Sequence, residues 1–312
     1  MYIHFRNEDS NLDQIPITEF KLENGVNVRI NEGNLTAGII LSTNTEEILL
    51  IPKIFDNGSK QYLIKYIDSR AFYLNKNIKS IAFSEDSELY KIDDGAFSES
   101  TIEKLSIPAN VVELGKKWCS LSERLNQIVI NPKNKHFAMI SEKFMVGKSR
   151  LNGMFDVILF VCRNIRGIIN IPKDILIIAP YAFNYCKKIR MITFNESSIL
   201  KTIDDWAFYG CINIERIMRI PSSVVKVGYQ SFMFVSKLKS IEFLSDEIHI
   251  CDSCFSQCFS LLVVSFPNAH KITIDNSAFY GSKKGSILFV TSEAKLYGNV
   301  WKFKKKRQFD RK

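Results

Sequence analysis

Three cysteines within one short segment are the residues whose spacing most resembles a metal site. Cys251, Cys254 and Cys258 form a C-x2-C-x3-C pattern, and His249 and His270 lie nearby. A closed structural zinc site needs four such ligands, usually arranged as two pairs. A repeated phrase, described below, already accounts for Cys254 and Cys258, which occupy two of its regular positions. We therefore predict no metal and no other cofactor, with zinc at these cysteines as the alternative.

Two pairs of adjacent aspartates resemble the paired carboxylates of acid–base catalysts. Asp93–Asp94 and Asp204–Asp205 occupy the same position of the repeated phrase, where acids at the start of a short helical turn favour the helix dipole. The sequence contains no P-loop, dinucleotide-binding, H-E-x-x-H or G-x-S-x-G pattern. We predict that the protein is not an enzyme. An enzyme built around the central segment 131–166 is a remote alternative.

The phrase that must position these residues returns about every 24 residues. It reads Ile-x-x-x-Ala-Phe, followed after a short gap by alternating apolar and polar residues. The anchor aromatics are 25 residues apart in the first pair, and 25, 24, 23 and 24 apart in the later run. A fixed period of this length is the signature of a stacked-coil solenoid. The predicted structural anchors are Phe72, Phe97, Phe183, Phe208, Phe232, Phe255 and Phe279.

Each copy of the phrase predicts the same succession of elements. An alternating segment such as Leu238–Phe243 indicates a strand with one buried face. A second short extended piece follows, as at Val224–Val227, and a short helical turn then carries the Ala-Phe pair. We predict a β-rich α/β solenoid with coils of about 23–25 residues. A parallel sheet would form one face of it, and short helical turns the other.

The repeat divides the chain into five segments. Trp118–Cys119 stands where an Ala-Phe pair is expected, so the coil that holds it is degenerate, and no anchor follows until the second run of repeats. Because exposed solenoid ends need caps, we predict atypical coils at both ends. The expected segments are 1–63 as an N-terminal cap with strands, 64–130 as repeats, 131–166 as an irregular attached insertion, 167–290 as repeats, and 291–312 as a C-terminal cap with a basic tail.

Charge is concentrated at one end of the chain. The net charge is +9, and Lys302–Lys312 contributes seven basic residues against one acid. We interpret this tail as a solubilising terminus, with contact to an acidic surface as the alternative. No zinc-finger spacing or stripe of Arg and aromatic residues predicts nucleic-acid binding. No secretory signal is recognisable at residues 1–10, and no apolar stretch reaches the ~20 residues of a membrane-spanning helix.

The repeated phrase resembles the leucine-rich repeats of the BspA-like family. The resemblance is carried by the I-P-S-S-V-x-x-V-G-x-x-S-F segment at 220–232 and the I-x-x-x-A-F-x-x-C segment at 178–186, and it covers about residues 36–290. The family contains surface antigens of oral bacteria and many proteins of parasitic protists such as trichomonads. Membership implies a right-handed leucine-rich solenoid. For the surface members it also implies adhesion to host matrix proteins or to other cells.

The open face of the predicted sheet is the expected binding surface, because stacked repeats present extended surfaces of this kind. Its outward residues share no common charge, which suits contact with a protein. We predict a non-catalytic protein-binding module, and the resemblance implies an adhesin-like surface antigen. The missing signal favours a cytoplasmic scaffold as the alternative. The predicted binding residues are Ser80, Lys104, Ser106, Gln127, Met191, Thr193, Arg216, Met218, Ser240, Glu242, Val263 and Ser265.

Overall fold

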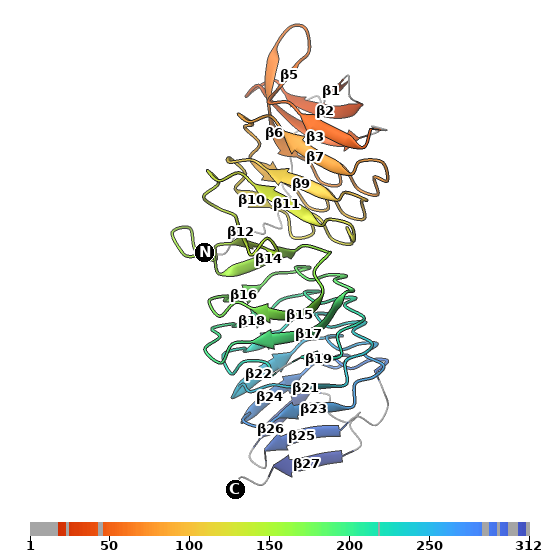
Figure 1. Cartoon of the computed structure of the whole chain (residues 1–312), viewed down its shortest axis with the longest axis vertical. Helices are drawn as coiled ribbons and strands as arrows, with labels where there is room; N and C mark the ends of the chain where they lie inside the picture. The colour runs from red at the N-terminus through yellow and green to blue at the C-terminus, as the bar shows by residue number, and fades with distance from the viewer. Residues whose placement is uncertain are drawn as a thin grey trace. The chain divides into compact units, whose positions relative to one another are not determined.

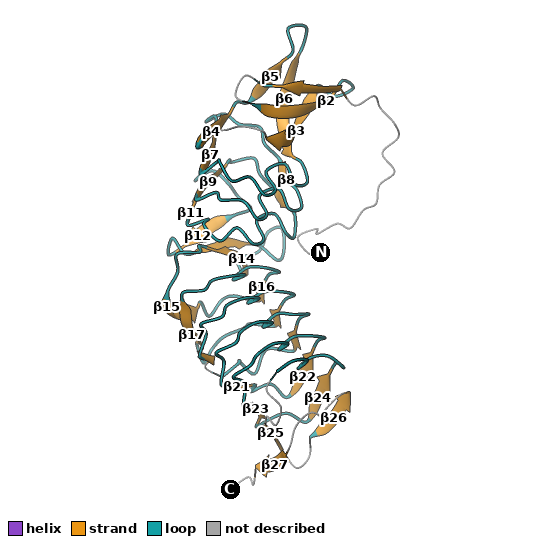
Figure 2. Cartoon of the chain, turned by 90° about the vertical axis from the view of Figure 1, so that its right-hand side faces the viewer, coloured by secondary structure: helices purple, strands orange, loops and turns teal. Residues whose placement is uncertain are grey.

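The chain folds into two compact units, Met1–Met154 and Phe155–Lys312. The computed structural model describes residues 18–22, 25–42, 46–217, 219–282, 287–291, 294–298 and 305–309. These residues form strands and turns, and none of them is helical (Figures 1 and 2). The described residues therefore include no helix long and apolar enough to span a bilayer. In each unit the strands build two sheets whose repeat coils pair parallel, called below the first and the second sheet.

The first sheet of the first unit contains the strands that the alternating segments predicted. All of its strand pairs are parallel. Partners in neighbouring repeat coils lie 23 or 24 residues apart, as Ser80 with Lys104 and Lys104 with Gln127 do. The strands, in spatial order, are β4 (Ile48–Ile51), β7 (Ser80–Phe83), β9 (Lys104–Ile107) and β11 (Gln127–Ile130).

The second sheet of the first unit begins as an antiparallel meander and continues as parallel strands. β1, β2 and β3 pair antiparallel, whereas β3, β6, β8 and β10 pair parallel. The strands are β1 (Thr18–Lys21), β2 (Val26–Asn31), β3 (Thr36–Ser42), β5 (Ile54–Asp56), β6 (Gln61–Ile67), β8 (Lys91–Ile92) and β10 (Glu113–Leu114). An antiparallel hairpin joins β12 (Ala138–Ile140) to β13 (Phe144–Gly147).

The first sheet of the second unit is also built from parallel strands, in two hydrogen-bonded groups, β15 to β19 and β21 to β27. Its pairs are parallel throughout, and β21 continues the stack after β19 through a bridge from Ile220 to Phe243. The strands are β15 (Gly167–Ile171), β17 (Ile189–Phe194), β19 (Arg216–Ile217), β21 (Ser240–Glu242), β23 (Val263–Phe266), β25 (Ile287–Thr291) and β27 (Lys305–Phe309).

The second sheet of the second unit is built from the second extended pieces of the coils. From β16 to β26, parallel partners lie 23 to 25 residues apart, as in Ile177 with Thr202 and Lys226 with His249. This spacing confirms the predicted coil length. The strands are β14 (Val157–Val161), β16 (Ile177–Ile178), β18 (Thr202–Ile203), β20 (Lys226–Val227), β22 (Glu247–Ile250), β24 (Lys271–Ile274) and β26 (Lys295–Gly298).

The segment that carries each anchor is a chain of tight turns, and the prediction of short helical turns was wrong. For every anchor except Phe279, the residues two positions before and after it have positive φ, as Trp206 (54°) and Gly210 (70°) do around Phe208. This left-handed conformation cannot continue an α-helix. The backbone N–H groups donate to the next coil instead: Phe208 N–H donates to the carbonyl of Ser231 at 2.7 Å. The turns thus add a third set of coil-to-coil hydrogen bonds.

The anchor phenylalanines form the centre of the core, as predicted. All seven are at most 7% exposed. In the first unit Phe72 stacks on Phe97, with ring centroids 5.2 Å apart. In the second unit the five anchors from Phe183 to Phe279 form a continuous stack with centroid distances of 4.5, 5.0, 5.2 and 5.3 Å. Trp118 of the degenerate coil is also buried and meets Phe97 edge-on at 6.4 Å.

The five segments predicted from the sequence can be compared with the strands of the structure. Segment 1–63 holds the antiparallel meander, and segment 131–166 holds the β12–β13 hairpin and the strand β14. Of segment 291–312, only Thr291, 294–298 and 305–309 belong to the described part of the chain. Lys302, Lys304, Arg311 and Lys312 of the predicted basic tail lie outside the described residues, and the five-segment division itself stays a prediction.

Candidate interaction surface

The predicted binding residues of the first unit stand side by side across the first sheet. Parallel register pairs Ser80 with Lys104 and Lys104 with Gln127, so these three side chains form one row. Ser106 is paired with Val129 in a second row. Lys104 and Gln127 are exposed, whereas Ser80 and Ser106 are half-buried.

The second unit continues the same pattern in its own first sheet. Met191 is paired with Arg216, and Thr193 with Asn170, whose side-chain oxygen accepts the threonine hydroxyl at 3.2 Å. Ser240 is paired with Val263 in the following run. Arg216 and Ser240 are exposed, and Met191, Thr193 and Val263 are half-buried.

Three of the predicted binding residues need separate comment. Glu242 is half-buried, and its carboxylate forms an ion pair with the guanidinium of Arg219, in which Nε lies 3.0 Å from Oε1. Ser265, its partner in register, is only 6% exposed, so it is part of the interior and does not contribute to the surface. Met218 lies outside the described residues.

Exposed apolar side chains on the same sheets were missed at the sequence level. Ile48 and Leu50 of β4 are 70% and 60% exposed, and Ile168 of β15 is 67% exposed. Leu49 and Ile51, between and after the first two, are fully buried. Because every residue of Ile48–Ile51 is apolar, alternation could not reveal which of them faces outward.

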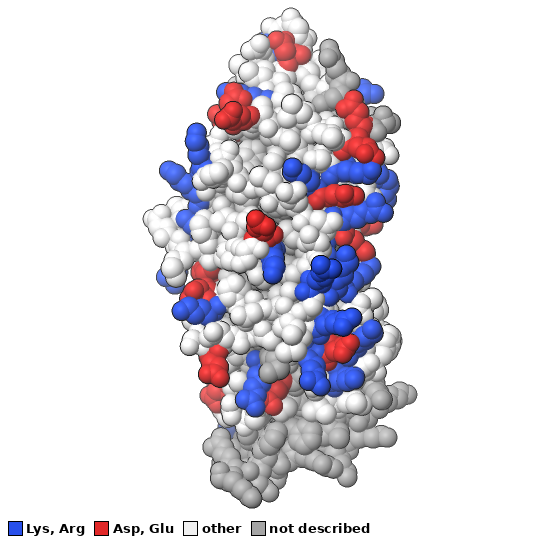
Figure 3. Space-filling view, viewed as in Figure 1, with Lys and Arg blue, Asp and Glu red and all other residues white. Residues whose placement is uncertain are grey.

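The first-sheet face carries few charges in its middle. Figure 3 looks onto the first sheet of each unit, where the surface over the strands is mostly uncharged and charged side chains of both signs lie toward the sides. The rows thus combine single apolar side chains with serine, threonine and glutamine. Depletion of charge at the centre of a patch is typical of protein–protein interfaces.

The cysteine pattern does not assemble a metal site from its three thiols. Cys254 and Cys258 are fully buried. The thiol of Cys258 donates to the carbonyl of Phe232 at 3.2 Å, and Cys254 Sγ lies 3.2 Å from the hydroxyl of Ser231. Burial raises the pKa of Cys258 to about 12 and that of Cys251 to about 11. Cys254 and Cys258 are therefore core residues that fix neighbouring coils.

Cys251 lies instead beside His249 of the second sheet and Asp275, which directly follows β24. The ligand atoms of His249, Cys251 and Asp275 are all within 4.8 Å of one another, and His249 Nε2 is 2.9 Å from Asp275 Oδ1. Such a mixed set could hold a divalent ion, but it provides one ligand fewer than the four of a closed zinc site. The histidine–aspartate pair already accounts for two of the three polar groups without a metal.

The second aspartate of each pair accepts a backbone N–H group of the following coil, a contact called here an aspartate clasp. The carboxylate of Asp94 accepts the backbone N–H of Lys117 at 3.2 Å, and that of Asp205 accepts the N–H of Tyr229 at 2.8 Å. Asp252 accepts the N–H of Ser277 at 3.1 Å in the same way. The acid recurs at these three positions because the following coil offers a turn N–H that needs an acceptor.

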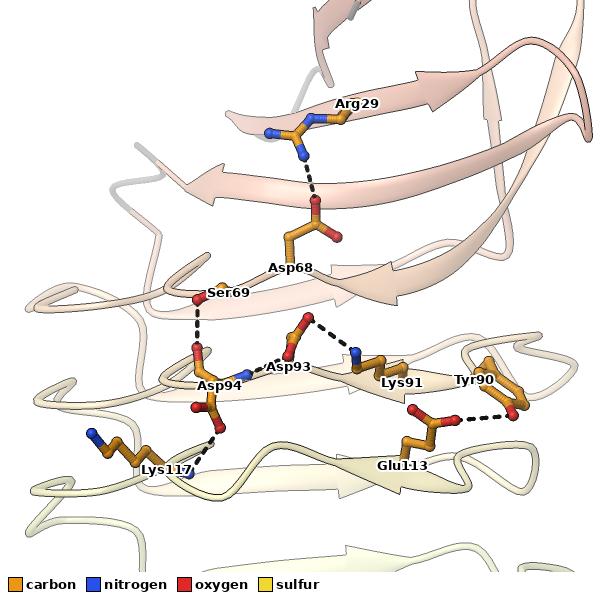
Figure 4. Close-up of polar contacts among 9 residues, drawn as sticks. All are labelled: Arg29, Asp68, Ser69, Tyr90, Lys91, Asp93, Asp94, Glu113 and Lys117. Carbon is orange, nitrogen blue, oxygen red and sulfur yellow. Dashed lines mark hydrogen bonds and ion pairs between the residues drawn. The ribbon is translucent and has the colours of Figure 1, made fainter. Parts of the chain in front are cut away.

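Figure 4 shows the polar column to which the first of these clasps belongs. Arg29 of β2 reaches Asp68 at 3.3 Å, and Lys91 of β8 reaches Asp93 at 3.2 Å. Burial raises the pKa of the Asp68 carboxyl, while the guanidinium of Arg29 opposes that rise. Asp94 and Glu113 thus bind partners from neighbouring coils, whereas Asp93 pairs with Lys91 of its own coil, and all three carboxylates are engaged within the fold.

Comparison with known proteins agrees with this architecture. Residues 57–149 and 159–285 match the model of the "BspA type Leucine rich repeat region", in six copies. A leucine rich cell surface protein from Faecalibacterium prausnitzii is 16% identical with a TM-score of 0.54, over 91% of this chain and 96% of that one. A leucine-rich repeat protein from Eubacterium ventriosum is 15% identical with a TM-score of 0.55, over 89% and 87%. No curated protein matches the sequence.

Two parallel sheets joined by stacked turns at a period of 23 to 25 residues define a leucine-rich-repeat solenoid. Because the family model matches more than half of the chain, the protein belongs to the BspA type leucine rich repeat family.

Proposed function

We propose that the protein is a non-catalytic module that binds another protein through its first-sheet face. The observation that carries this proposal is the row of side chains that parallel register sets side by side, as in Ser80, Lys104 and Gln127. The buried positions of the coils repeat, whereas the exposed positions differ from coil to coil. A face that is rigid in backbone and varied in side chain suits the recognition of one particular partner.

Exposed apolar side chains supply the anchors that such an interface needs. Ile48 and Leu50 stand at the edge of the first sheet of the first unit, and Val129 stands at its other edge. Isolated apolar groups among polar ones resemble interface anchors surrounded by a polar rim. Burial of one such side chain contributes about 1.5–3 kcal/mol.

The finer role that we propose is adhesion to a host matrix or cell-surface protein. Two things support it: the family, and a solved relative that is described as a cell surface protein. The aspartate pairs and core cysteines, which could have suggested an enzyme, are engaged between coils. Their engagement supports the non-catalytic part of the proposal.

Location on the cell tests the adhesion role. Intact and permeabilised cells of the source organism would be probed with antibody to this chain. Signal on intact cells is the expected result, and binding to a panel of immobilised matrix proteins would then be measured. Signal only after permeabilisation would contradict adhesion and favour an intracellular scaffold that uses the same face.

A further inference from the structure

A recess with basic walls lies in the second unit, beside the first sheet. It has a volume of about 490 Å³, and its lining includes the cations Arg166, Lys187, Lys188, Arg190 and Lys237 against a single acid, Glu215. Figure 3 shows Lys and Arg side chains gathered on the side of this unit at which strands β15 and β17 begin. The recess is therefore a strongly positive hollow outside the rows of the interaction surface.

The solenoid fixes the backbone that carries these cations. The N–H of Gly167 donates to the carbonyl of Lys188 at 3.0 Å, and the N–H of Glu215 donates to that of Arg190 at 2.9 Å. The side chain of Asn213 donates to the carbonyl of Lys187 at 2.8 Å. Four successive coils contribute to the lining. At about 4.8 Å per coil the cations are spread over about 14 Å.

Four of the five cations of the recess are not paired with an acid among the described residues. Within the described part of the chain, Arg166, Lys188, Arg190 and Lys237 have no carboxylate oxygen within 4.0 Å. Other lysines of the protein do, as Lys271 with Glu247 at 3.1 Å. Unpaired like charges held close together repel one another, and an anion that binds among them relieves that repulsion.

The kinds of side chain that line the recess indicate which class of anionic molecule fits it. Apart from glycine the lining consists of charged side chains and one asparagine, so it lacks the aromatic and aliphatic anchors of a protein hot spot. It also lacks the aromatic platforms on which single-stranded nucleic acids stack. A hydrophilic chain with closely spaced anionic groups fits both the composition and the length of the recess.

We propose that this recess binds a sulfated polysaccharide, with arginine and lysine contacting its sulfate groups. The proposal is independent of the protein-binding face, since none of the predicted binding residues of that face lines the recess. Arginine offers two parallel donors to an oxyanion, and lysine adds a mobile point charge.

The test measures binding of the full chain to heparin fragments of defined length over a range of NaCl concentrations. The variant Lys188→Glu/Arg190→Glu is compared with Lys201→Glu/Lys226→Glu, a second-sheet control with the same change in net charge at two exposed lysines: Lys201 directly before β18, and Lys226 in β20. Both variants keep the basic tail. Equal unfolding midpoints establish that the fold is intact, and Lys188→Gln/Arg190→Gln replaces the first variant if it fails to fold.

We expect the recess variant to bind at least about tenfold more weakly, because about two counterion-releasing contacts are lost. Its slope of log Kd against log[NaCl] should fall by about two. The second-sheet variant should stay within about twofold of the wild type. Equal weakening by both variants would overturn the proposal and assign heparin binding to net charge. Equally tight binding of desulfated heparin, polyglutamate, single-stranded RNA or anionic vesicles would overturn the choice of ligand.

Discussion

The rings of Phe208 and Phe232 lie 5.0 Å apart between centroids, with their planes 6° from parallel. The two residues are 24 positions apart in the sequence and belong to neighbouring coils. Repeated between successive anchors, this contact determines the spacing of the coils. It thereby positions every exposed side chain of the sheets relative to the next.

Truncation of a central anchor tests this core directly. Phe208→Ala should lower the free energy of unfolding by about 3–5 kcal/mol, because it removes a buried aromatic that stacks on both sides. Denaturant unfolding measures the change. Phe259→Ala, at a position that is 56% exposed, is the matched control and should cost much less. Equal losses at the two positions would show that the anchors are not the core.

Glycine 228 tests how closely neighbouring coils approach. A Cβ atom at Gly228 would lie 2.6 Å from the backbone nitrogen of Asp205, so Gly228→Ala requires the backbone to move. We expect a loss of about 1–3 kcal/mol in the free energy of unfolding. At Gly33 the nearest atom would lie at an ordinary 3.4 Å, and Gly33→Ala should change stability little. A neutral Gly228→Ala variant would contradict the described approach of the coils.

Acid should weaken the aspartate clasps. The N–H and hydroxyl of Ser277 hold the pKa of the Asp252 carboxyl below its ordinary value. A lowered folded-state pKa gives stability that is present above the unfolded pKa of about 3.9 and is lost as pH falls through the folded value. Asp252→Asn should therefore be less stable than the wild type at pH 7, and the difference should shrink toward pH 3. A difference that is constant over this range would exclude the charge as its cause.

The cysteines should be unreactive while the protein is folded. Burial raises the pKa of Cys258 to about 12 and that of Cys251 to about 11, so little thiolate exists at pH 8. Iodoacetamide should label the native protein slowly and all seven cysteines after unfolding. Rapid labelling of one native cysteine would reveal an activated thiol and would revive an enzymatic interpretation.

The sequence predicted the anchors and the first-sheet strands because their spacing is regular and long enough to detect. Strands of the second sheet such as Lys226–Val227 have only two residues, too few to show alternation. The left-handed turn positions were missed because many hold ordinary residues, such as Arg70 and Trp206. There the coil-to-coil hydrogen bonds outweigh the local cost of positive φ, and no residue type marks the site.

The candidate surface was predicted only in part, for a related reason. Alternation identified Lys104 and Gln127 correctly as exposed. It failed for Ile48 and Leu50, where outward and inward residues are both apolar, and for Ser265, a polar residue that is buried. The basic recess could not be predicted at all. Arg166, Lys188 and Lys237 are far apart in the sequence, and only the stacking of coils brings them together.

The most direct test of the account is binding of a matrix protein to first-sheet variants. Wild type, Lys104→Glu/Gln127→Glu and the second-sheet control Lys201→Glu/Lys226→Glu would be compared by surface binding against each protein of the immobilised panel. We predict saturable binding of at least one matrix protein, weakened about tenfold or more by the first-sheet changes and within about twofold for the control. Failure of every matrix protein to bind, or equal binding by all three forms of the protein, would contradict the assignment of this face.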